Sequence, residues 1–164
     1  MIKKSAAMIV VLCLFLWQAS ALQETLNPEK IERIVFSSKT IELLENEGNL
    51  VPQMKPGNMV VLQYSKQHAE DPNMSDDELH ESVLFEVNPA WNSFVYRKKI
   101  ALSKATYQLG CFCAERGYYR ITGGFIRGKK LTNGKYYIQA DVSFTFKNGV
   151  TKKIKFSGEF KPAT

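Results

Sequence analysis

Residues 117–160 read GYYRITGGFIRGKKLTNGKYYIQADVSFTFKNGVTKKIKFSGEF, and this stretch decides the fold of the chain. Apolar and polar residues alternate along 136–146 and 150–160, which is typical of strands with one face on a core and the other in water. Asn148-Gly149 lies between these runs, and Asn133-Gly134 precedes the first. Both dipeptides favour hairpins, because a type I′ turn needs positive φ at both central residues. The last third of the chain is therefore predicted to form three antiparallel strands.

The charge of the chain is unevenly distributed. Its 164 residues suffice for one domain with a core, and the net charge is +6. Residues 22–96 hold five Lys/Arg and thirteen Asp/Glu, whereas residues 97–164 hold fifteen and three. Either the two halves face each other and partly cancel, or a basic face binds an acidic partner such as lipid headgroups or an acidic protein. Nucleic acid is not an expected partner, because the N-terminus carries an export signal.

Residues 1–21 are predicted to be a signal peptide or a signal anchor. Lys3 and Lys4 precede an apolar run over residues 6–17, and Ala19-Ser20-Ala21 forms a small-x-small cleavage site. Cleavage leaves a domain free in the periplasm, whereas retention anchors it to the inner membrane. Both alternatives place residues 22–164 outside the cytoplasm as a single α+β domain, with membrane contact only through residues 1–21 if these are retained.

The predicted fold class is α+β, with an N-terminal amphipathic helix packed on a largely antiparallel sheet. Asn27 can cap this helix, its apolar residues follow helical spacing, and Gly48 is a natural stop. Residues 89–109 are ambiguous. As strands they predict a barrel-like sheet, and this alternative is preferred because β-branched and aromatic residues cluster there. As a second helix they predict a cone-like sheet.

Cys111 and Cys113 form a Cys-Phe-Cys sequence and are a candidate disulfide or redox-sensitive pair. Exported cysteines are usually paired, yet residues two apart on a strand lie near the roughly 7 Å Cα limit for a bridge. Four interpretations follow, in order of preference: a local structural or labile disulfide, an intermolecular disulfide, a soft-metal site, and two free buried thiols.

His68 and His80 lie in an acidic segment, residues 66–82. Nearby carboxylates favour protonated imidazole, so the two histidines are candidate pH-sensing residues, although solvated surface histidines are the preferred interpretation. No hydrolase, metalloprotease or phosphate-loop motif is present in the sequence. The chain is therefore predicted not to be an enzyme, with no catalytic residues, metal or cofactor.

The exported domain follows the order strand, acidic loop, strand and tryptophan turn, in the segments PGNMVVL (56–62), Asp76-Asp77, SVLF (82–85) and Ala90-Trp91. This layout resembles the small periplasmic accessory proteins that partner ToxR-like membrane-anchored transcriptional activators, namely the ToxS, PsaF and MyfF type.

The resemblance implies a non-enzymatic protein that binds and stabilises its activator's periplasmic domain. Such a protein helps to sense pH, temperature or a small ligand and controls fimbrial or virulence genes. Tyr118 and Tyr137 are candidates to line an interface or a cavity for a small apolar ligand. The alternatives are a free periplasmic binding or inhibitor module, for instance an immunity protein, and a pilus or secretion-system assembly subunit.

Overall fold

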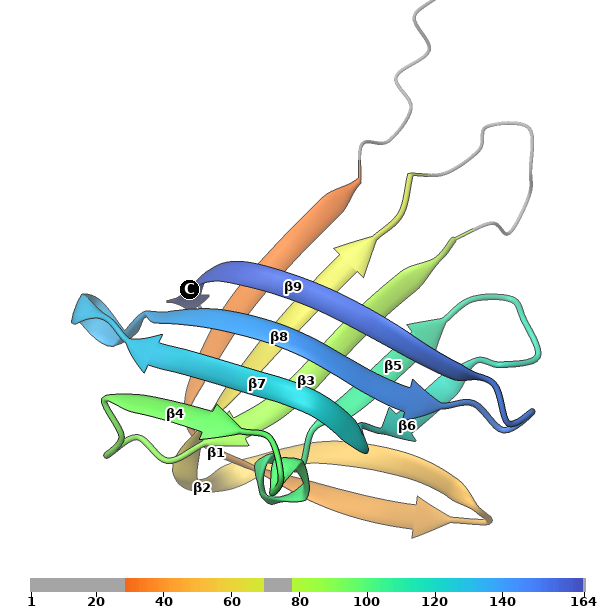
Figure 1. The fold of residues 1–164 in the computed structure, drawn as a ribbon, viewed down its shortest axis with the longest axis horizontal. Coiled ribbons are helices and arrows are strands. Elements are labelled where there is room, and N and C mark those ends of the chain that lie inside the picture. The colour runs from red at the N-terminus through yellow and green to blue at the C-terminus, as the bar shows by residue number, and fades with distance from the viewer. Residues whose placement is uncertain (1–28, 70–77, 164) are drawn as a thin grey trace, which may run out of the picture.

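The computed structural model describes residues 29–69 and 78–163, which form nine strands and two short 3-10 turns (Figure 1). The strands are β1 (Lys30–Asn46), β2 (Asn49–Gln67), β3 (His80–Val87), β4 (Ser93–Tyr96), β5 (Thr106–Gly110), β6 (Gly117–Arg120), β7 (Gly123–Lys130), β8 (Tyr136–Thr145) and β9 (Thr151–Pro162). The 3-10 turns are η2 (Ile100–Ser103) and η3 (Thr132–Gly134).

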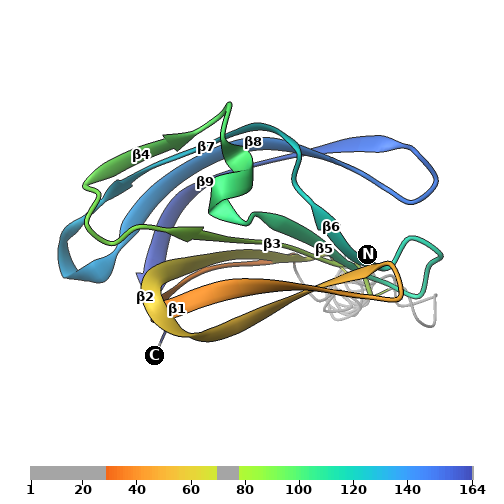
Figure 2. The same cartoon turned by 90° about the horizontal axis from the view of Figure 1, so that it is seen from below.

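All nine strands belong to one open sheet with the order β4-β7-β8-β9-β1-β2-β3-β5-β6. The strand pairs are antiparallel except β1 with β9, which are parallel and meet only at Ile34–Lys161 and Val35–Pro162. At this narrow junction the sheet folds back on itself into two layers (Figure 2). We call β4, β7, β8 and β9 the C-terminal layer, and β1, β2, β3, β5 and β6 the N-terminal layer.

The main core lies between the two layers. Along β8 the residues alternate between buried and less buried, as the period-two pattern predicts, and β8 pairs with both β7 and β9 through hairpins at the two Asn-Gly sites. Aromatic rings join the layers: Tyr64 stacks on Phe156 with centroids 4.4 Å apart, and Tyr107 stacks on Phe144 at 3.9 Å. The two predicted hairpins are therefore confirmed, but residues 117–130 form two strands, β6 and β7, in different layers rather than one strand.

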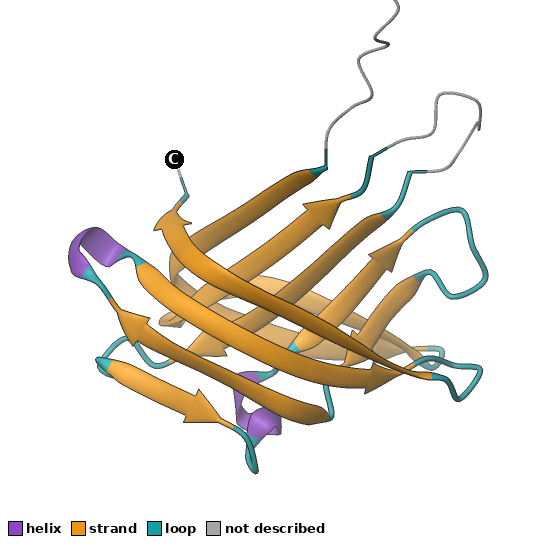
Figure 3. Ribbon diagram, turned by 45° about the horizontal axis from the view of Figure 1, so that its top comes forward, coloured by secondary structure: helices purple, strands orange, loops and turns teal. Residues whose placement is uncertain are grey.

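The predicted N-terminal helix is wrong, and with it the α+β fold class. The structure is nearly all sheet (Figure 3), and the residues expected to be helical form β1. Gly48, taken as a helix stop, lies instead in the turn of the β1–β2 hairpin, where Glu47 and Gly48 have φ of 50° and 76°. Asn27, the expected cap, lies outside the described residues. The apolar spacing of β1 suited a helix, but long-range pairing with β2 overrides local preference.

The alternative second helix at 89–109 is also wrong, because this segment contains β4, η2 and the first residues of β5. The preferred prediction of strands at 89–109 agrees better with the structure, which has β4 and the start of β5 there. The predicted barrel-like sheet is wrong, because the sheet is open and β4 and β6 are its two edge strands. Lys104 ends η2 in a left-handed conformation with φ of 47°. This turn of the chain separates β4 from β5, so the segment is not one continuous strand.

The β1–β2 hairpin bends sharply in the middle. Ser38 has φ of 55°, and Lys39 pairs with both Pro56 and Met59, so the register shifts there. A Cβ on Gly57 would lie 2.8 Å from the Thr40 side chain, so the bend requires glycine at this position. The bend carries residues 39–57, which we call the arm, across the outer face of the N-terminal layer (Figure 2).

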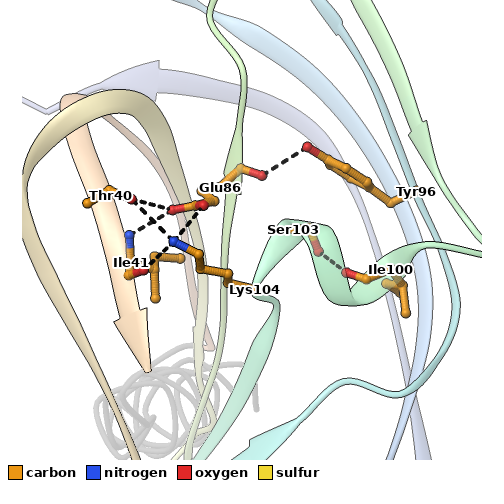
Figure 4. Close-up of polar contacts among 7 residues, drawn as sticks. All are labelled: Thr40, Ile41, Glu86, Tyr96, Ile100, Ser103 and Lys104. Carbon is orange, nitrogen blue, oxygen red and sulfur yellow. Dashed lines mark hydrogen bonds and ion pairs between the residues drawn. The ribbon is translucent and has the colours of Figure 1, made fainter. Parts of the chain in front are cut away.

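A buried carboxylate holds the base of the arm (Figure 4). Glu86 on β3 is 4% exposed and accepts hydrogen bonds from the Ile41 N–H at 2.8 Å and the Thr40 hydroxyl at 2.9 Å. Lys104 pairs with Glu86 at 2.9 Å and donates to the Ile41 carbonyl at 2.7 Å. The side chains of Glu86 and Lys104 thus satisfy the N–H and the carbonyl of Ile41, which form no hydrogen bond with a neighbouring strand.

We predict that Glu86→Ala lowers the free energy of unfolding by about 1–3 kcal/mol, because it leaves the buried Ile41 N–H without its acceptor and removes the partner of the partly exposed Lys104. Urea unfolding followed by circular dichroism measures this change. Glu159→Ala is the matched control, since Glu159 pairs with Lys135 on the surface and its removal should leave stability nearly unchanged. Equal effects of the two variants would contradict the role of Glu86.

Candidate functional site

Cys111 and Cys113 lie in the loop that joins β5 to β6, and the structure places their Sγ atoms at disulfide distance. Their Cα atoms are 5.2 Å apart, closer than the spacing expected for an extended strand, because the chain bends after Gly110. Of the four interpretations, this geometry matches the local disulfide. Phe112 between them is 83% exposed, so the loop displays an aromatic ring to solvent.

The structure separates the two histidines. His68 Nε2 lies 2.8 Å from Glu81 Oε2, at the end of the molecule where β2 stops and β3 begins. His80 precedes Glu81 on β3 and therefore points to the opposite face of the sheet, against Gly110. Residues 70–77 of the acidic segment lie outside the described residues, so the structure does not test the idea that both histidines offset that charge.

Glu81 is the centre of a small polar cluster. The Tyr107 hydroxyl donates to Glu81 Oε1 at 2.6 Å, and His68 contacts the other carboxylate oxygen. Burial raises the pKa of Glu81, but the hydrogen bonds from Tyr107 and His68 and nearby positive charge outweigh it and bring the pKa below its ordinary value. Burial, and then the bond to Glu81, raises the pKa of Tyr107.

The outer face of the C-terminal layer is basic and aromatic. The strand register places Val95, Arg127, Gln139 and Ser157 in one row across β4, β7, β8 and β9. The neighbouring rows carry the outward side chains of Lys129, Tyr137, Phe125, Asp141 and Lys155. The positive charges of residues 97–164 are thus partly gathered on one sheet face.

Two adjacent depressions mark this face, and we call them together the basic groove. The larger, of about 610 Å³, lies where β9 passes the start of β1 and the end of β2, and its cations are Arg33, Lys66, Arg127 and Lys155. The smaller, of about 430 Å³, lies over β4, β7 and β8. Both are lined by Arg127 and Gln139, so they meet at this pair.

The cations of the groove differ in their partners. Lys66 pairs with Glu29 at 2.9 Å and Lys155 pairs with Asp141 at 3.1 Å. In contrast, Arg33 and Arg127 form no ion pair with any residue that the structure describes. Lys129, which lines the smaller depression, also forms no ion pair among the described residues, so Arg33, Arg127 and Lys129 are the unneutralised charges of the basic groove.

Aromatic rings and a glycine position the two arginines. The guanidinium of Arg127 lies 5.6 Å from the Phe125 ring centroid, and its Nε donates to Gln139 at 2.8 Å. Arg33 lies 6.0 Å from the Tyr64 ring centroid. Its Nε is buried without a hydrogen-bond partner in the described structure, and a Cβ on Gly158 would come within 2.8 Å of it. Both cations are therefore held by packing and remain available to an external anion.

Other chemistry is sparse in residues 29–69 and 78–163. They contain no cluster of three or more His, Cys, Asp or Glu side chains placed to hold a metal ion. They also contain no helix with the length and apolar character that a membrane crossing needs. The segment predicted to be a signal peptide or anchor, residues 1–21, lies outside the described residues.

Sequence reasoning anticipated the basic face only as one of two alternatives, from the charge asymmetry, and it missed Arg33. The sequence predicts a helix at Arg33, and a helix does not indicate the approach of this side chain to β9. The alternating pattern of β8 and β9 did identify which residues point outward, so Lys155 could be found from the sequence.

We predict that Tyr107→Phe reduces the acid sensitivity of the fold. Ionised Glu81 has a lowered pKa, so it stabilises the native state above its ordinary pKa of 4.5, and this contribution is lost as pH falls through the folded value. Removing the Tyr107 bond raises the pKa of Glu81, and the loss of stability between about pH 7 and pH 3 becomes smaller.

Urea unfolding at about pH 7 and about pH 3 measures how much stability the native protein and Tyr107→Phe each lose between these pH values. Tyr136→Phe is the matched control, because Tyr136 is buried and its pKa is raised by burial alone. It should shift stability equally at the two pH values. An unchanged pH dependence in Tyr107→Phe would show that Tyr107 does not set the pKa of Glu81.

We predict that Cys111 and Cys113 in the native protein resist maleimide until a reductant is added. Peptide mass mapping locates the label and separates these cysteines from Cys13. The exposure of Phe112 indicates that the reagent can reach the loop, so protection would reflect pairing. Labelling without reductant, or a dimer on a non-reducing gel that depends on these cysteines, would contradict the local disulfide.

Comparison of the chain with protein-family models, curated proteins and solved structures finds no match. The resemblance to ToxS-like accessory proteins therefore has no support from these comparisons. The function is inferred from the chemistry of the described residues, among which the basic groove joins two depressions of about 610 and 430 Å³.

Proposed function

We propose that this protein is a non-enzymatic accessory protein of the periplasm that binds and stabilises the periplasmic domain of a membrane-anchored transcriptional activator. The basic groove binds an acidic surface of that domain. The single observation that carries the proposal is the pair Arg33 and Arg127, two positioned guanidinium groups without a carboxylate partner among the described residues.

The composition of the groove supports a protein partner. Arginine and aromatic residues are enriched at protein interfaces, where they supply most of the binding free energy. The groove combines Arg33 and Arg127 with the rings of Phe125 and Tyr137, and Val95 nearby is 67% exposed. An acidic partner would supply the carboxylates that the arginines lack, in the bidentate geometry that guanidinium favours.

The accessory role rests on the predicted export segment and on the resemblance to ToxS-like proteins. In this role the protein helps its activator to respond to pH, temperature or a small ligand, and so controls fimbrial or virulence genes. The His68–Glu81–Tyr107 cluster and the Cys111–Cys113 pair are the candidate sensing elements.

A free periplasmic binding or inhibitor module is the second candidate. The specific observation in its favour is the small-x-small site Ala19-Ser20-Ala21, which predicts release from the membrane. Such a module uses the same basic groove but is stable without a membrane partner.

We predict that Arg127→Glu with Lys129→Glu weakens partner binding. The full-length chain is expressed with and without its neighbouring gene, and the experiment measures membrane fractionation, N-terminal sequence and co-purification with the neighbour's product. The native protein should retain residues 1–21, fractionate with the inner membrane and decline without its partner. The double variant should bind at least about tenfold more weakly, because it replaces attraction by repulsion.

Lys98→Glu with Lys99→Glu is the matched control, since both lysines are exposed in the connection between β4 and η2. This control reverses the same charge outside the groove and should leave co-purification unchanged. A soluble protein that begins at Leu22 and is indifferent to its neighbour would reject the accessory role and favour the free module.

A further inference from the structure

A second site lies on the opposite side of the molecule, between the arm and the outer face of the N-terminal layer. Two adjacent cavities of about 360 and 160 Å³ occupy this space, and Gln108 and Tyr118 line both. Residues 49–54 of the arm form one wall, and the outward residues of β3, β5 and β6 form the other. We call this space the arm cleft.

The arm is held above the layer at three places. Glu86 and Lys104 bind its base, Arg120 on β6 pairs with Glu45 at 2.8 Å, and Lys147 donates to Asn49 at its tip at 2.7 Å. These contacts span both ends of the arm. The cleft is therefore a consequence of the bend in β1 and β2 together with these contacts, which fix the separation of its walls without filling it.

The larger cavity of the arm cleft has mostly apolar walls, whereas the smaller is lined by apolar and uncharged polar residues in equal number. The arm supplies Leu50, Val51, Pro52 and Met54, and the outer face of the layer supplies Leu84; Leu109 borders the larger cavity, but its side chain belongs to the main core. Met54 is 41% exposed, as expected for an apolar side chain beside an unfilled space. Tyr118 adds an aromatic ring between the two cavities.

The polar groups of the smaller cavity are uncharged. The smaller cavity is lined by Gln63, Ser82, Thr106 and Gln108 in addition to its apolar residues, and none of its lining residues is ionised. Ser82 donates to Gln108 at 3.1 Å, so this pair is partly satisfied within the wall. In the larger cavity the charged residues are Arg116 and Lys147, both exposed, and Lys147 is bound to Asn49.

We propose that the arm cleft binds a small uncharged apolar molecule, with its body against Leu84, Met54 and Tyr118 and one hydrogen-bonding group toward Gln108. Ligand sites are typically concave, mostly apolar and of about 300–1,000 Å³, with few convergent polar groups. An ionised ligand is disfavoured in the smaller cavity, because its walls offer no opposite charge. Cys111 also lines the larger cavity, which places the disulfide loop at the wall of this site.

This site is independent of the proposed partner-binding function. It lies on the N-terminal layer, whereas the basic groove lies mainly on the C-terminal layer, and the two share no lining residue. A failure of one proposal therefore leaves the other standing.

The test uses N-phenyl-1-naphthylamine, an uncharged apolar dye that fluoresces in apolar surroundings, titrated into the full-length protein. Met54→Glu places a carboxylate in the cleft wall, and Val95→Glu makes the same kind of change at an exposed residue of the other layer. The apolar residues 6–17 are identical in all three proteins, so dye bound there does not contribute to a difference between them.

The expected result is saturable binding that Met54→Glu weakens by at least about tenfold and that Val95→Glu leaves unchanged, with circular dichroism showing that both variants are folded. Absent saturable binding, or binding that only Val95→Glu weakens, would overturn the site. The anionic analogue 1-anilinonaphthalene-8-sulfonate tests the ligand class. Tighter binding of this analogue than of the uncharged dye would overturn the assignment to uncharged molecules.

Discussion

The buried contact between Glu86, Lys104 and the backbone of Ile41 is the interaction on which the rest of the structure depends (Figure 4). It stands where β1 leaves its short parallel contact with β9 and bends into the arm. Glu86 is buried, whereas the Lys104 side chain is 39% exposed and keeps part of its solvation. Their role here is positional, because they satisfy the Ile41 backbone groups on the edge of β1 that does not pair with β2.

The bend has consequences on both sides of the molecule. Before the bend, β1 passes close to β9, and Arg33 reaches Gly158 and contributes to the basic groove. After it, the arm crosses the N-terminal layer and encloses the arm cleft. One change of strand direction thus creates two surfaces of different chemistry, one cationic and open, the other partly enclosed and without a charged residue in its smaller cavity.

This separation suits an accessory protein that binds a partner and responds to its surroundings. Long-range charge favours encounter with an acidic partner at the basic groove, whereas burial of apolar surface favours a small molecule in the arm cleft. The Glu81 cluster and the disulfide loop lie at the end of the sheet where β3 and β5 pair, and they connect through that pairing to the wall of the cleft.

The sequence by itself determined the two hairpins that join β7, β8 and β9, because alternation and Asn-Gly turns act between residues that are close in the chain. It did not separate β6 from β7, because β6 pairs with β5 in the other layer. It also indicated the uneven charge and the cysteine and histidine candidates. Only the tertiary structure decided that residues 30–46 form a strand, since their apolar spacing suits a helix until β2 pairs with them. Likewise, Arg33 and Arg127 come together, and Glu86 meets Ile41, through contacts between residues far apart in the chain, which local patterns do not encode.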